Sequence, residues 1–455
     1  MPTTRALSLV ATGIPVRRPW YTARSDGDLS PPESASGSRQ YRGREDVKFQ
    51  PDTIIMEPGA VVCRVGVPGL LRFGQLELFA ARQQWAELTQ LANYACLKEY
   101  PEILAAEGVA LPAGDEAAAK AFVGGTGPLG RYVSLLRAVA ASTAHLAVEW
   151  LRVGYCQGNM NSDNTLLGGR TIDYGPYGWL ERFEPMYQPF TSDQEGKFAF
   201  INQATAMNVN VVVLSKSFEQ LLKHVSQHHQ DLGQSGLTEA QAAGALADAS
   251  AELASIAKEE FASLFQAGFD DMRRRKLGLR RLCESVPEDA ALWSQLSRLL
   301  CDSWADYTIF FRLLVDVHKD CAALEAREAL ALLSGSFYEA APAVGEGRRA
   351  AGPRVDSPQW LLWLDKYLAR LRADGDDGRG ERVEQQAQTN PKFVLRNWMA
   401  VLAYEAASQG DYSVIEELMR VLQAPYEEQD AETSGRWFAK APSWARGMPG
   451  CSYFS

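Results

Sequence analysis

Several residue types that mark common protein classes are scarce in this sequence. Its 455 residues include five histidines and seven cysteines, and the cysteines form no CxxC pair. None of them has a histidine at the spacing of zinc ligands, which argues against a zinc module. An odd number of scattered cysteines, mostly in apolar surroundings, instead indicates reduced core thiols in an intracellular protein.

Long apolar runs and an excess of positive charge are missing as well. No run approaches the ~18 apolar residues of a membrane-spanning helix, so no membrane partner is expected. The net charge of −10 argues against nucleic-acid binding, because a broad binding face would be basic. What remains is an ordinary globular composition, with 46% hydrophobic residues, in a chain long enough for about two or three domains.

The N-terminal part alternates between β-like and polar segments. Residues 6–10 are apolar and precede Gly13; the run is too short for a targeting peptide and predicts a core strand that enters a turn. Residues 18–50 are polar and rich in Ser, Gly and Pro, which predicts an exposed, mobile insertion. Residues 60–65 predict another strand, and helical spacing begins at Leu76.

The rest of the chain has mostly helical patterns. One apolar stripe runs through residues 131–153, and Gly154 is placed to end this helix. Irregular aromatic segments extend from Pro176 to residue 202, and helical patterns continue over residues 205–424. The sequence therefore predicts an α+β fold that is predominantly helical, with a small N-terminal β part.

The segment NSDNTLLGGRTIDYGP, residues 161–176, carries the most chemical information. Its two adjacent glycines, 168 and 169, are typical of a tight hairpin turn, because glycine reaches the positive φ that such turns require. Pairing the arms outward from the turn places Asn164 opposite Asp173, with Cβ atoms about 5 Å apart. One carboxylate and one amide oxygen suit Mg²⁺, which takes few protein ligands and completes its shell with water and phosphate.

A simpler interpretation is a turn whose Asx side chains only bind their own backbone. The sequence Asp173-Tyr174-Gly175 favours the metal site, because it repeats the Asp-aromatic-Gly pattern that holds metal in protein kinases. One kinase feature is absent, since Asn159 stands where a kinase has its catalytic aspartate, five residues before the metal-binding Asn. An ordinary protein kinase is therefore disfavoured.

Nearly the whole chain resembles one family, the selenoprotein O family. The matching segments include PTTRALSLVATG, EPGAVVCRV with LRFG, GYCQGNMNSDNTLLGGRTIDYGPYGWLERFEP, GKFAFINQ, DSWADYTIFFRLL, NPKFVLRNW and PYEEQ. The resemblance implies a protein-kinase-like fold and a protein adenylyltransferase, which moves AMP from ATP to Ser, Thr or Tyr hydroxyls of protein partners. It also implies a mitochondrial location if the source is a eukaryote.

The resemblance assigns roles to five residues. Asp163 corresponds to the proton acceptor, and Asn164 and Asp173 to the ligands of Mg²⁺, for which Mn²⁺ is an alternative. Arg64 and Arg72 correspond to two arginines that contact ATP together with Asp173. Planar guanidinium groups suit this role because they bind phosphate oxygens in pairs.

The sequence departs from the family pattern at three places. Gln157 stands where the family commonly has His, and we expect it to lie directly behind the site. Arg64 and Arg72 are eight residues apart, one more than the usual spacing. The family also carries a glycine-rich phosphate loop and a lysine upstream of PTTRAL, and this sequence starts inside that motif. We therefore expect low activity from residues 1–455 alone.

We expect three regions in this family arrangement. Residues 1–73 would be a remnant of an N-terminal nucleotide-binding lobe, residues 74–330 a helical lobe with the catalytic loop and metal hairpin at 155–176, and residues 331–455 a helical extension. The family ends in a reactive Cys or selenocysteine, so we expect the natural chain to continue two or three residues past Ser455. Two other functions stay open, a non-catalytic pseudokinase or interaction module, and γ-phosphoryl transfer.

Two further patterns have simple explanations. The basic run RRRK at residues 273–276 stands at the predicted end of a helix, where it would complement the helix dipole and stay solvated. His224, His228 and His229 have a spacing seen in metal sites but lack the Glu of an HExxH motif, which favours surface histidines.

Overall fold

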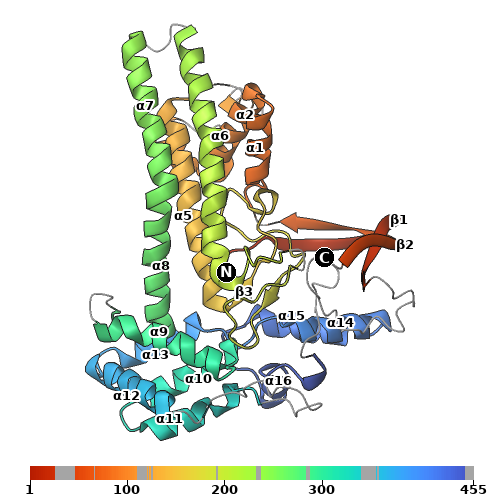
Figure 1. The fold of residues 1–455 in the computed structure, drawn as a ribbon, viewed down its shortest axis with the longest axis vertical. Coiled ribbons are helices and arrows are strands. Elements are labelled where there is room, and N and C mark those ends of the chain that lie inside the picture. Colours follow the sequence, from red (N-terminus) through yellow and green to blue (C-terminus); the bar gives the residue numbers. More distant parts are fainter. Residues whose placement is uncertain are drawn as a thin grey trace.

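The computed structural model describes most of the chain: residues 1–25, 47–65, 67–109, 120, 122–123, 125, 127–190, 193–231, 237–282, 287–339, 355 and 358–445. These residues form a predominantly helical molecule with two small two-stranded sheets. Long helices stand upright in Figure 1, shorter C-terminal helices cross beneath them, and a β-ribbon projects to one side. The expectation of a mostly helical α+β fold is confirmed.

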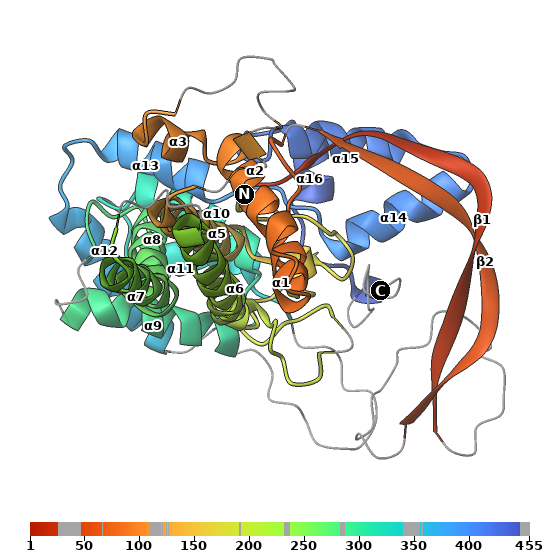
Figure 2. The same ribbon diagram turned by 90° about the horizontal axis from the view of Figure 1, so that it is seen from above.

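The ribbon consists of β1 (Arg5–Ser25) and β2 (Val47–Val65), which pair antiparallel from Arg5↔Val65 to Ser25↔Val47. Figure 2 shows it arching away from the helices. The strand predicted at residues 6–10 exists, but the expected core position is wrong: the side chains of Leu9 and Val10 are 70% and 54% exposed. In the described part of the chain, β1 pairs with β2 alone, and a two-stranded sheet buries little apolar surface by itself.

The insertion expected at residues 18–50 is shorter than predicted. Strand β1 continues to Ser25 and β2 already begins at Val47, so strand pairing takes up both ends of the segment. The β-forming residues Trp20, Tyr21 and Thr22 outweigh the neighbouring arginines and proline here. Residues 26–46 lie outside the described part of the chain.

The central helix is α5 (Leu129–Val153), as predicted from its apolar stripe. Gly154 ends it with a φ of 74°, a left-handed conformation that glycine adopts without strain. Helices α6, α7 and α8 pack around α5, and a π-helical turn, η3, joins α7 to α8. Helices α1 and α2 pack against α6. The bounds are α1 (Phe73–Ala81), α2 (Trp85–Lys98), α3 (Pro101–Ala106), α6 (Gln203–Asp231), α7 (Glu239–Ser255), η3 (Ile256–Glu260) and α8 (Phe261–Lys276).

The C-terminal helices confirm the helical pattern predicted up to residue 424. Trp360 and Trp363 of α12 share a hydrophobic core with Phe310 of α10, and a smaller core surrounds Trp398 and Trp437. The bounds are α9 (Pro287–Asp302), α10 (Tyr307–Lys319), α11 (Ala326–Leu333), α12 (Pro358–Ala373), α13 (Arg379–Thr389), α14 (Asn397–Ser408), α15 (Ser413–Gln423) and α16 (Ala431–Trp437).

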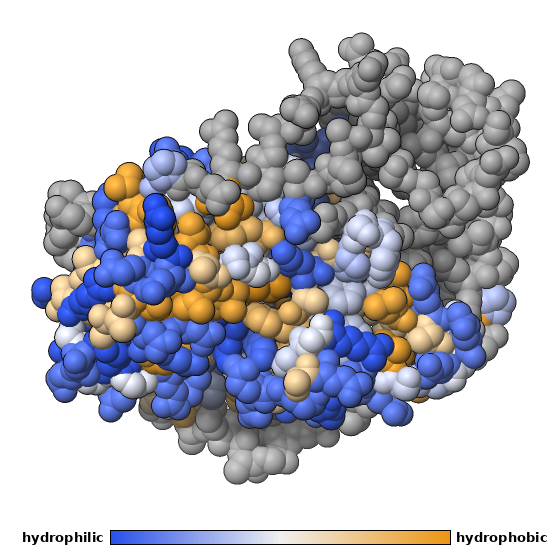
Figure 3. Space-filling model, turned by 90° about the horizontal axis from the view of Figure 1, so that it is seen from below, coloured by the Kyte–Doolittle hydropathy of each residue, from blue (hydrophilic) through white to orange (hydrophobic). Residues whose placement is uncertain are grey.

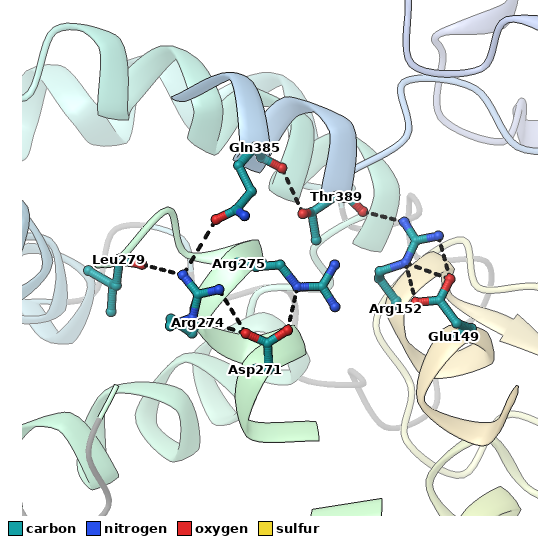
Figure 4. A network of polar contacts seen from close by, with 8 residues as sticks. All are labelled: Glu149, Arg152, Asp271, Arg274, Arg275, Leu279, Gln385 and Thr389. Carbon is teal, nitrogen blue, oxygen red and sulfur yellow. Dashed lines mark hydrogen bonds and ion pairs between the residues drawn. The ribbon is translucent and has the colours of Figure 1, made fainter. Parts of the chain in front are cut away.

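Polar contacts, some buried and some exposed, join α13 to the central helices. Arg152 at the end of α5 holds Glu149 in a salt bridge and donates a hydrogen bond to the carbonyl oxygen of Thr389. Arg274 of α8 bonds both Asp271 and the side chain of Gln385 (Figure 4). A further buried ion pair, Asp306 with Arg396, lies between α10 and the start of α14 and is at most 2% exposed.

The basic run at residues 273–276 is not solvated as expected. It does end α8, but Arg273 is 6% and Lys276 1% exposed. The Lys276 ammonium donates hydrogen bonds of 2.8 Å to the carbonyl oxygen of Arg152 and to Oδ1 of Asn390, and it lies 4.0 Å from the ring centre of Phe311. Burial, and then the positive charge of Arg152, lower the pKa of Lys276. Partners that are distant in sequence make burial of this amine possible.

The surface seen from below carries a band of apolar side chains between hydrophilic ones (Figure 3). Among the exposed apolar residues of the C-terminal helices, Leu332 and Leu362 are 42% and 60% exposed. In the described part of the chain, no helix combines the length and the hydropathy needed to span a membrane. Of the described cysteines, Cys96, Cys156 and Cys321 are buried thiols as expected, whereas Cys63 is exposed.

Candidate active site

The loop after α5 turns at the two glycines, but its arms do not form the predicted hairpin ladder. The amide of Gly169, with a φ of 60°, donates to the carbonyl oxygen of Leu166 and closes the turn. Leu166 then pairs with Arg72, and Thr171 with Thr3. The turn signal was therefore correct, whereas the pairing of Asn164 with Asp173 was wrong, because segments from the N-terminal part of the chain take the hydrogen bonds of both arms.

The predicted site residues nevertheless surround one cavity. Its volume is about 440 Å³, which lies in the range of ordinary ligand pockets. Two arginines and two aspartates line it, a combination that suits an anionic ligand that carries a cation. The lining residues are Arg64, Arg72, Asp163, Asn164, Ile172, Asp173, Tyr174 and Gly175.

Asp163 and Asn164 lie in a single 3-10 turn, Ser162–Asn164. The amide of Asn164 donates a 2.8 Å hydrogen bond to the carbonyl oxygen of Asn161 and closes the turn. The side-chain Nδ2 of Asn164 donates to the carbonyl oxygen of Asn159 at 3.3 Å. That contact fixes which end of the amide is nitrogen and leaves Oδ1 as the oxygen that can bind a cation.

Asp173 has a φ of 58°, a left-handed conformation that is uncommon for any residue other than glycine. Gln157 supports this strained backbone: its Nε2 donates to the carbonyl oxygens of Ile172 and Asp173 at 2.8 and 2.9 Å. Gln157 is 1% exposed and accepts a 2.7 Å hydrogen bond from the hydroxyl of Tyr155. Gln157 therefore lies directly behind the site, as expected from the motif, and holds Asp173 from the backbone side.

The two carboxylates of the cavity repel each other. Burial, and then the charge of Asp163, raise the pKa of Asp173, although Arg64 and Arg72 act in the opposite direction. A bound divalent cation would relieve this repulsion. Asn164 and Asp173 offer one amide and one carboxylate oxygen, a hard donor set that fits Mg²⁺ or Mn²⁺. Throughout the described residues, no cluster of three or more His, Cys, Asp or Glu side chains offers a competing metal site.

Arg64 and Arg72 enter the cavity from two neighbouring segments. Arg64 lies near the end of β2; its Nη1 donates a 2.8 Å hydrogen bond to Oγ1 of Thr4, and its guanidinium carbon lies 5.7 Å from the ring centre of Tyr174. Arg72 precedes α1, and its Nη1 donates to the backbone carbonyl oxygen of Asp163 at 3.1 Å. The departure from the usual arginine spacing thus still brings both guanidinium groups to the cavity.

Comparison with known proteins supports the resemblance. A family model described as protein adenylyltransferase SelO matches residues 42–423, most of the chain. The chain belongs to the SelO family. The protein nucleotidyltransferase YdiU of Aromatoleum aromaticum is 31% identical over an alignment that covers all of this chain and 68% of the relative. The proteins of the same name from Flavobacterium johnsoniae and Rhodopirellula baltica are 32% and 31% identical and are covered to 69% and 70%.

Beyond the residues that line the cavity, Thr4 and Glu77 of this SelO-family chain also contact the site without having been predicted. Thr4 binds Arg64, as described above. Glu77 of α1 accepts a 2.8 Å hydrogen bond from the hydroxyl of Ser162, next to Asp163. Burial raises the pKa of Glu77, and the charge of Asp163 adds to the effect. Both residues stand in or beside quoted family motifs, PTTRAL and LRFG, so motif membership was the signal that could have found them.

The start of α1 packs tightly on the 3-10 turn Ser162–Asn164. A Cβ on Gly74 would lie 3.2 Å from the backbone nitrogen of Asp163, so glycine permits this close approach. The amide of Phe73 donates a 3.0 Å hydrogen bond to the carbonyl oxygen of Thr165. The LRFG motif thus places Arg72 beside the Ser162–Asn164 turn.

Proposed function

We propose that this chain transfers AMP from ATP to Ser, Thr or Tyr hydroxyl groups of protein substrates. The observation that carries the proposal is the convergence of Arg64, Arg72, Asp163, Asn164 and Asp173 on one cavity of about 440 Å³ in a chain of the SelO family. Its relatives are named protein nucleotidyltransferases. The arrangement matches the needs of nucleotidyl transfer, in which positioning and charge stabilisation dominate catalysis.

Each side chain has a defined task in this proposal. The guanidinium groups of Arg64 and Arg72 bind phosphate oxygens of ATP. The carboxylate of Asp163 accepts the proton of the substrate hydroxyl while the oxygen of that hydroxyl forms a bond to the α-phosphorus. The bond from the α-phosphorus to the bridging oxygen breaks, and pyrophosphate leaves with the electron pair.

Asn164 and Asp173 would hold the metal, with Mg²⁺ as the natural choice and Mn²⁺ as an alternative. When bound, the metal supplies positive charge that neutralises the phosphate oxygens. Gln157 keeps Asp173 in its strained conformation, so the carboxylate keeps its direction before the nucleotide arrives.

We also propose that the helical part has a protein-kinase-like arrangement, which the Asp173-Tyr174-Gly175 motif supports. In that arrangement, Asn159 stands at the position of the kinase catalytic aspartate. Its side chain instead accepts a hydrogen bond from the amide of Asn161 within the loop. A neutral amide cannot accept a proton as a carboxylate does, which supports Asp163 as the acceptor.

The reaction can be identified by which phosphate of ATP becomes attached to protein. The purified chain would be incubated with Mg²⁺, a mixture of candidate acceptor proteins and ATP labelled on either the α or the γ phosphate. We expect label on protein from α-labelled ATP only, together with release of pyrophosphate. Label from γ-labelled ATP would identify phosphoryl transfer. Because we expect low activity from residues 1–455 alone, the incubation is long, and an Asp163→Asn variant gives the background. Absence of both labels above that background would reject catalysis by these residues and support an interaction module.

A further inference from the structure

The first residues of the chain lie along the segment that leads to Asp173. The amide of Thr171 donates to the carbonyl oxygen of Pro2 at 3.0 Å, and the amide of Thr4 donates to the carbonyl oxygen of Thr171 at 3.3 Å. The hydroxyl of Thr171 also donates to Pro2 and accepts a 2.9 Å hydrogen bond from Nε1 of Trp150 in α5. This chain of contacts fixes residues 2–4 to the central helix.

The hydroxyl of Thr4 connects two parts of the site. Its side chain is 5% exposed, so little water can replace its hydrogen bonds. Oγ1 accepts the 2.8 Å hydrogen bond from Nη1 of Arg64 and donates a long one, 3.4 Å, to the carbonyl oxygen of Thr171. The guanidinium of Arg64 is thus linked through Thr4 to the segment that carries Asp173.

Arg64 has few other constraints on its orientation. Within the described residues, its guanidinium has this one hydrogen bond and the ring contact with Tyr174, and it forms no salt bridge. An arginine side chain has several freely rotating bonds, and ordering it on ligand binding costs conformational entropy. A fixed hydroxyl that holds the group beforehand reduces that cost.

We propose that Thr4 is a positioning residue that orients Arg64 toward the phosphates of the nucleotide. The inference rests on the proposed function, because it takes Arg64 to bind the phosphates of ATP. It gives the second threonine of the PTTRAL motif a role in substrate binding. The chemical requirement is an acceptor hydroxyl, so serine can replace threonine and isosteric valine cannot.

Equilibrium binding of a fluorescent ATP analogue with Mg²⁺, followed by competition with ATP, tests this role. We expect Thr4→Val to weaken binding about tenfold, as loss of a hydrogen bond to a charged group predicts. Thr4→Ser should stay within about twofold of the unchanged protein. Thr12→Val is the matched control: Thr12 lies in β1, a few residues after Thr4, and donates a 3.0 Å hydrogen bond to the carbonyl oxygen of Gly59, but it is exposed.

A double substitution separates positioning from general support of the fold. In a background of Arg64→Ala, Thr4→Val should have almost no further effect on binding, because the group that Thr4 orients is gone. If the full tenfold loss persisted in that background, or if Thr4→Ser were as weak as Thr4→Val, the role of Thr4 would be rejected. Equal binding by Thr4→Val and the unchanged protein would reject it while leaving the proposed function intact. If the protein without substitutions failed to bind Mg·ATP, both the role of Thr4 and the proposed function would be rejected.

Discussion

The β-ribbon and the helical body are built on opposite principles, although both contribute to the same cavity. In the ribbon, large apolar side chains such as Leu9, Ile14 and Val61 are more than half exposed, and among the described residues the two strands pair only with each other. In the body, even polar groups such as Asp306 and Lys276 are buried and satisfied. Stability is therefore concentrated in the helices, since isolated two-stranded sheets are marginal in water.

This difference divides the site into two halves. Asp163, Asn164 and Asp173 belong to a loop fixed by the central helix and by α1. Arg64 instead comes from the base of the ribbon, where the hydrogen bond to Thr4 ties it to the body. The acidic half is thus held by many independent contacts, whereas the position of Arg64 depends on few.

The largest effects are expected from substitution of Asp163 or Asp173, and the two substitutions should differ in their effect on nucleotide binding. Asp173→Ala should reduce AMP transfer at least 10³-fold and sharply weaken Mg·ATP binding, because the metal loses its anionic protein ligand. Asp163→Ala should reduce turnover by about 10²–10⁴-fold and largely spare binding, since it acts on the proton. Transfer from α-labelled ATP and calorimetric titration measure the two quantities. The same loss of binding in both variants would contradict this division.

A large loss of stability is expected from opening the buried ion pair of the body. Asp306→Ala should lower the free energy of unfolding by about 3–5 kcal/mol, because it leaves the buried guanidinium of Arg396 without its partner. Urea unfolding followed by circular dichroism measures the change. Arg436→Ala, which breaks the exposed pair with Glu417, is the control and should cost less than about 1 kcal/mol. Equal losses of unfolding free energy in the two variants would show that burial does not determine the cost of breaking an ion pair.

The Glu149–Arg152 pair predicts a specific pH dependence. Burial tends to raise the pKa of Glu149, but the hydrogen bond and charge of Arg152 outweigh it and lower the pKa to about 2. A carboxylate with a depressed native pKa stabilises the fold above its unfolded pKa, near 4.5, and loses that contribution as pH falls through 2. The difference corresponds to about 3 kcal/mol.

Glu149→Gln should therefore destabilise the protein by about that amount at pH 7 and flatten the acid unfolding curve between pH 4.5 and 2. Urea unfolding at a series of pH values measures both effects. Glu219→Gln serves as the control, because Glu219 pairs with Lys223 at an exposed position. An unchanged acid midpoint in Glu149→Gln would show that another carboxylate controls acid unfolding.

The smallest effect is expected in the ribbon. Leu9→Ala should change the free energy of unfolding by less than about 0.5 kcal/mol, because the side chain is already exposed. The same substitution at Leu136 in α5, which is fully buried, should cost about 2–5 kcal/mol. Thermal and urea unfolding of the two variants compare them directly. A large loss from Leu9→Ala would indicate that the ribbon is covered in solution.

The sequence correctly predicted those elements whose formation depends on residues close to one another along the chain. The stripe of α5 and its glycine stop follow from helical geometry alone. The five site residues were predictable because they lie in three contiguous motifs, EPGAVVCRV, LRFG and the segment at residues 154–185. The hairpin ladder was not, since strand pairing depends on which distant segment competes for the hydrogen bonds, here residues 2–4 and 71–73.

Burial of charged residues was also beyond local patterns. Four consecutive basic residues look solvated until Asn390, far along the chain, supplies an acceptor for Lys276. The core position predicted for the strand at residues 6–10 was wrong for the same reason, because the number of layers around a strand is a property of the whole fold. The division of the chain at residues 73 and 330, and the kinase-like arrangement, stay predictions.

The π-helical turn between α7 and α8 determines the directions in which the side chains of α8 point relative to those of α7. Each residue added to a helix turns the succeeding side chains by about 100° around its axis. The wider turn at Ile256–Glu260 therefore lets α7 and α8 both pack on α5, although a regular helix would present a different face of α8. Removing one residue there would rotate Lys276 away from Arg152 and Asn390. The contacts that Lys276 makes with Arg152 and Asn390 thus depend on the angular register of a single turn near the middle of the chain.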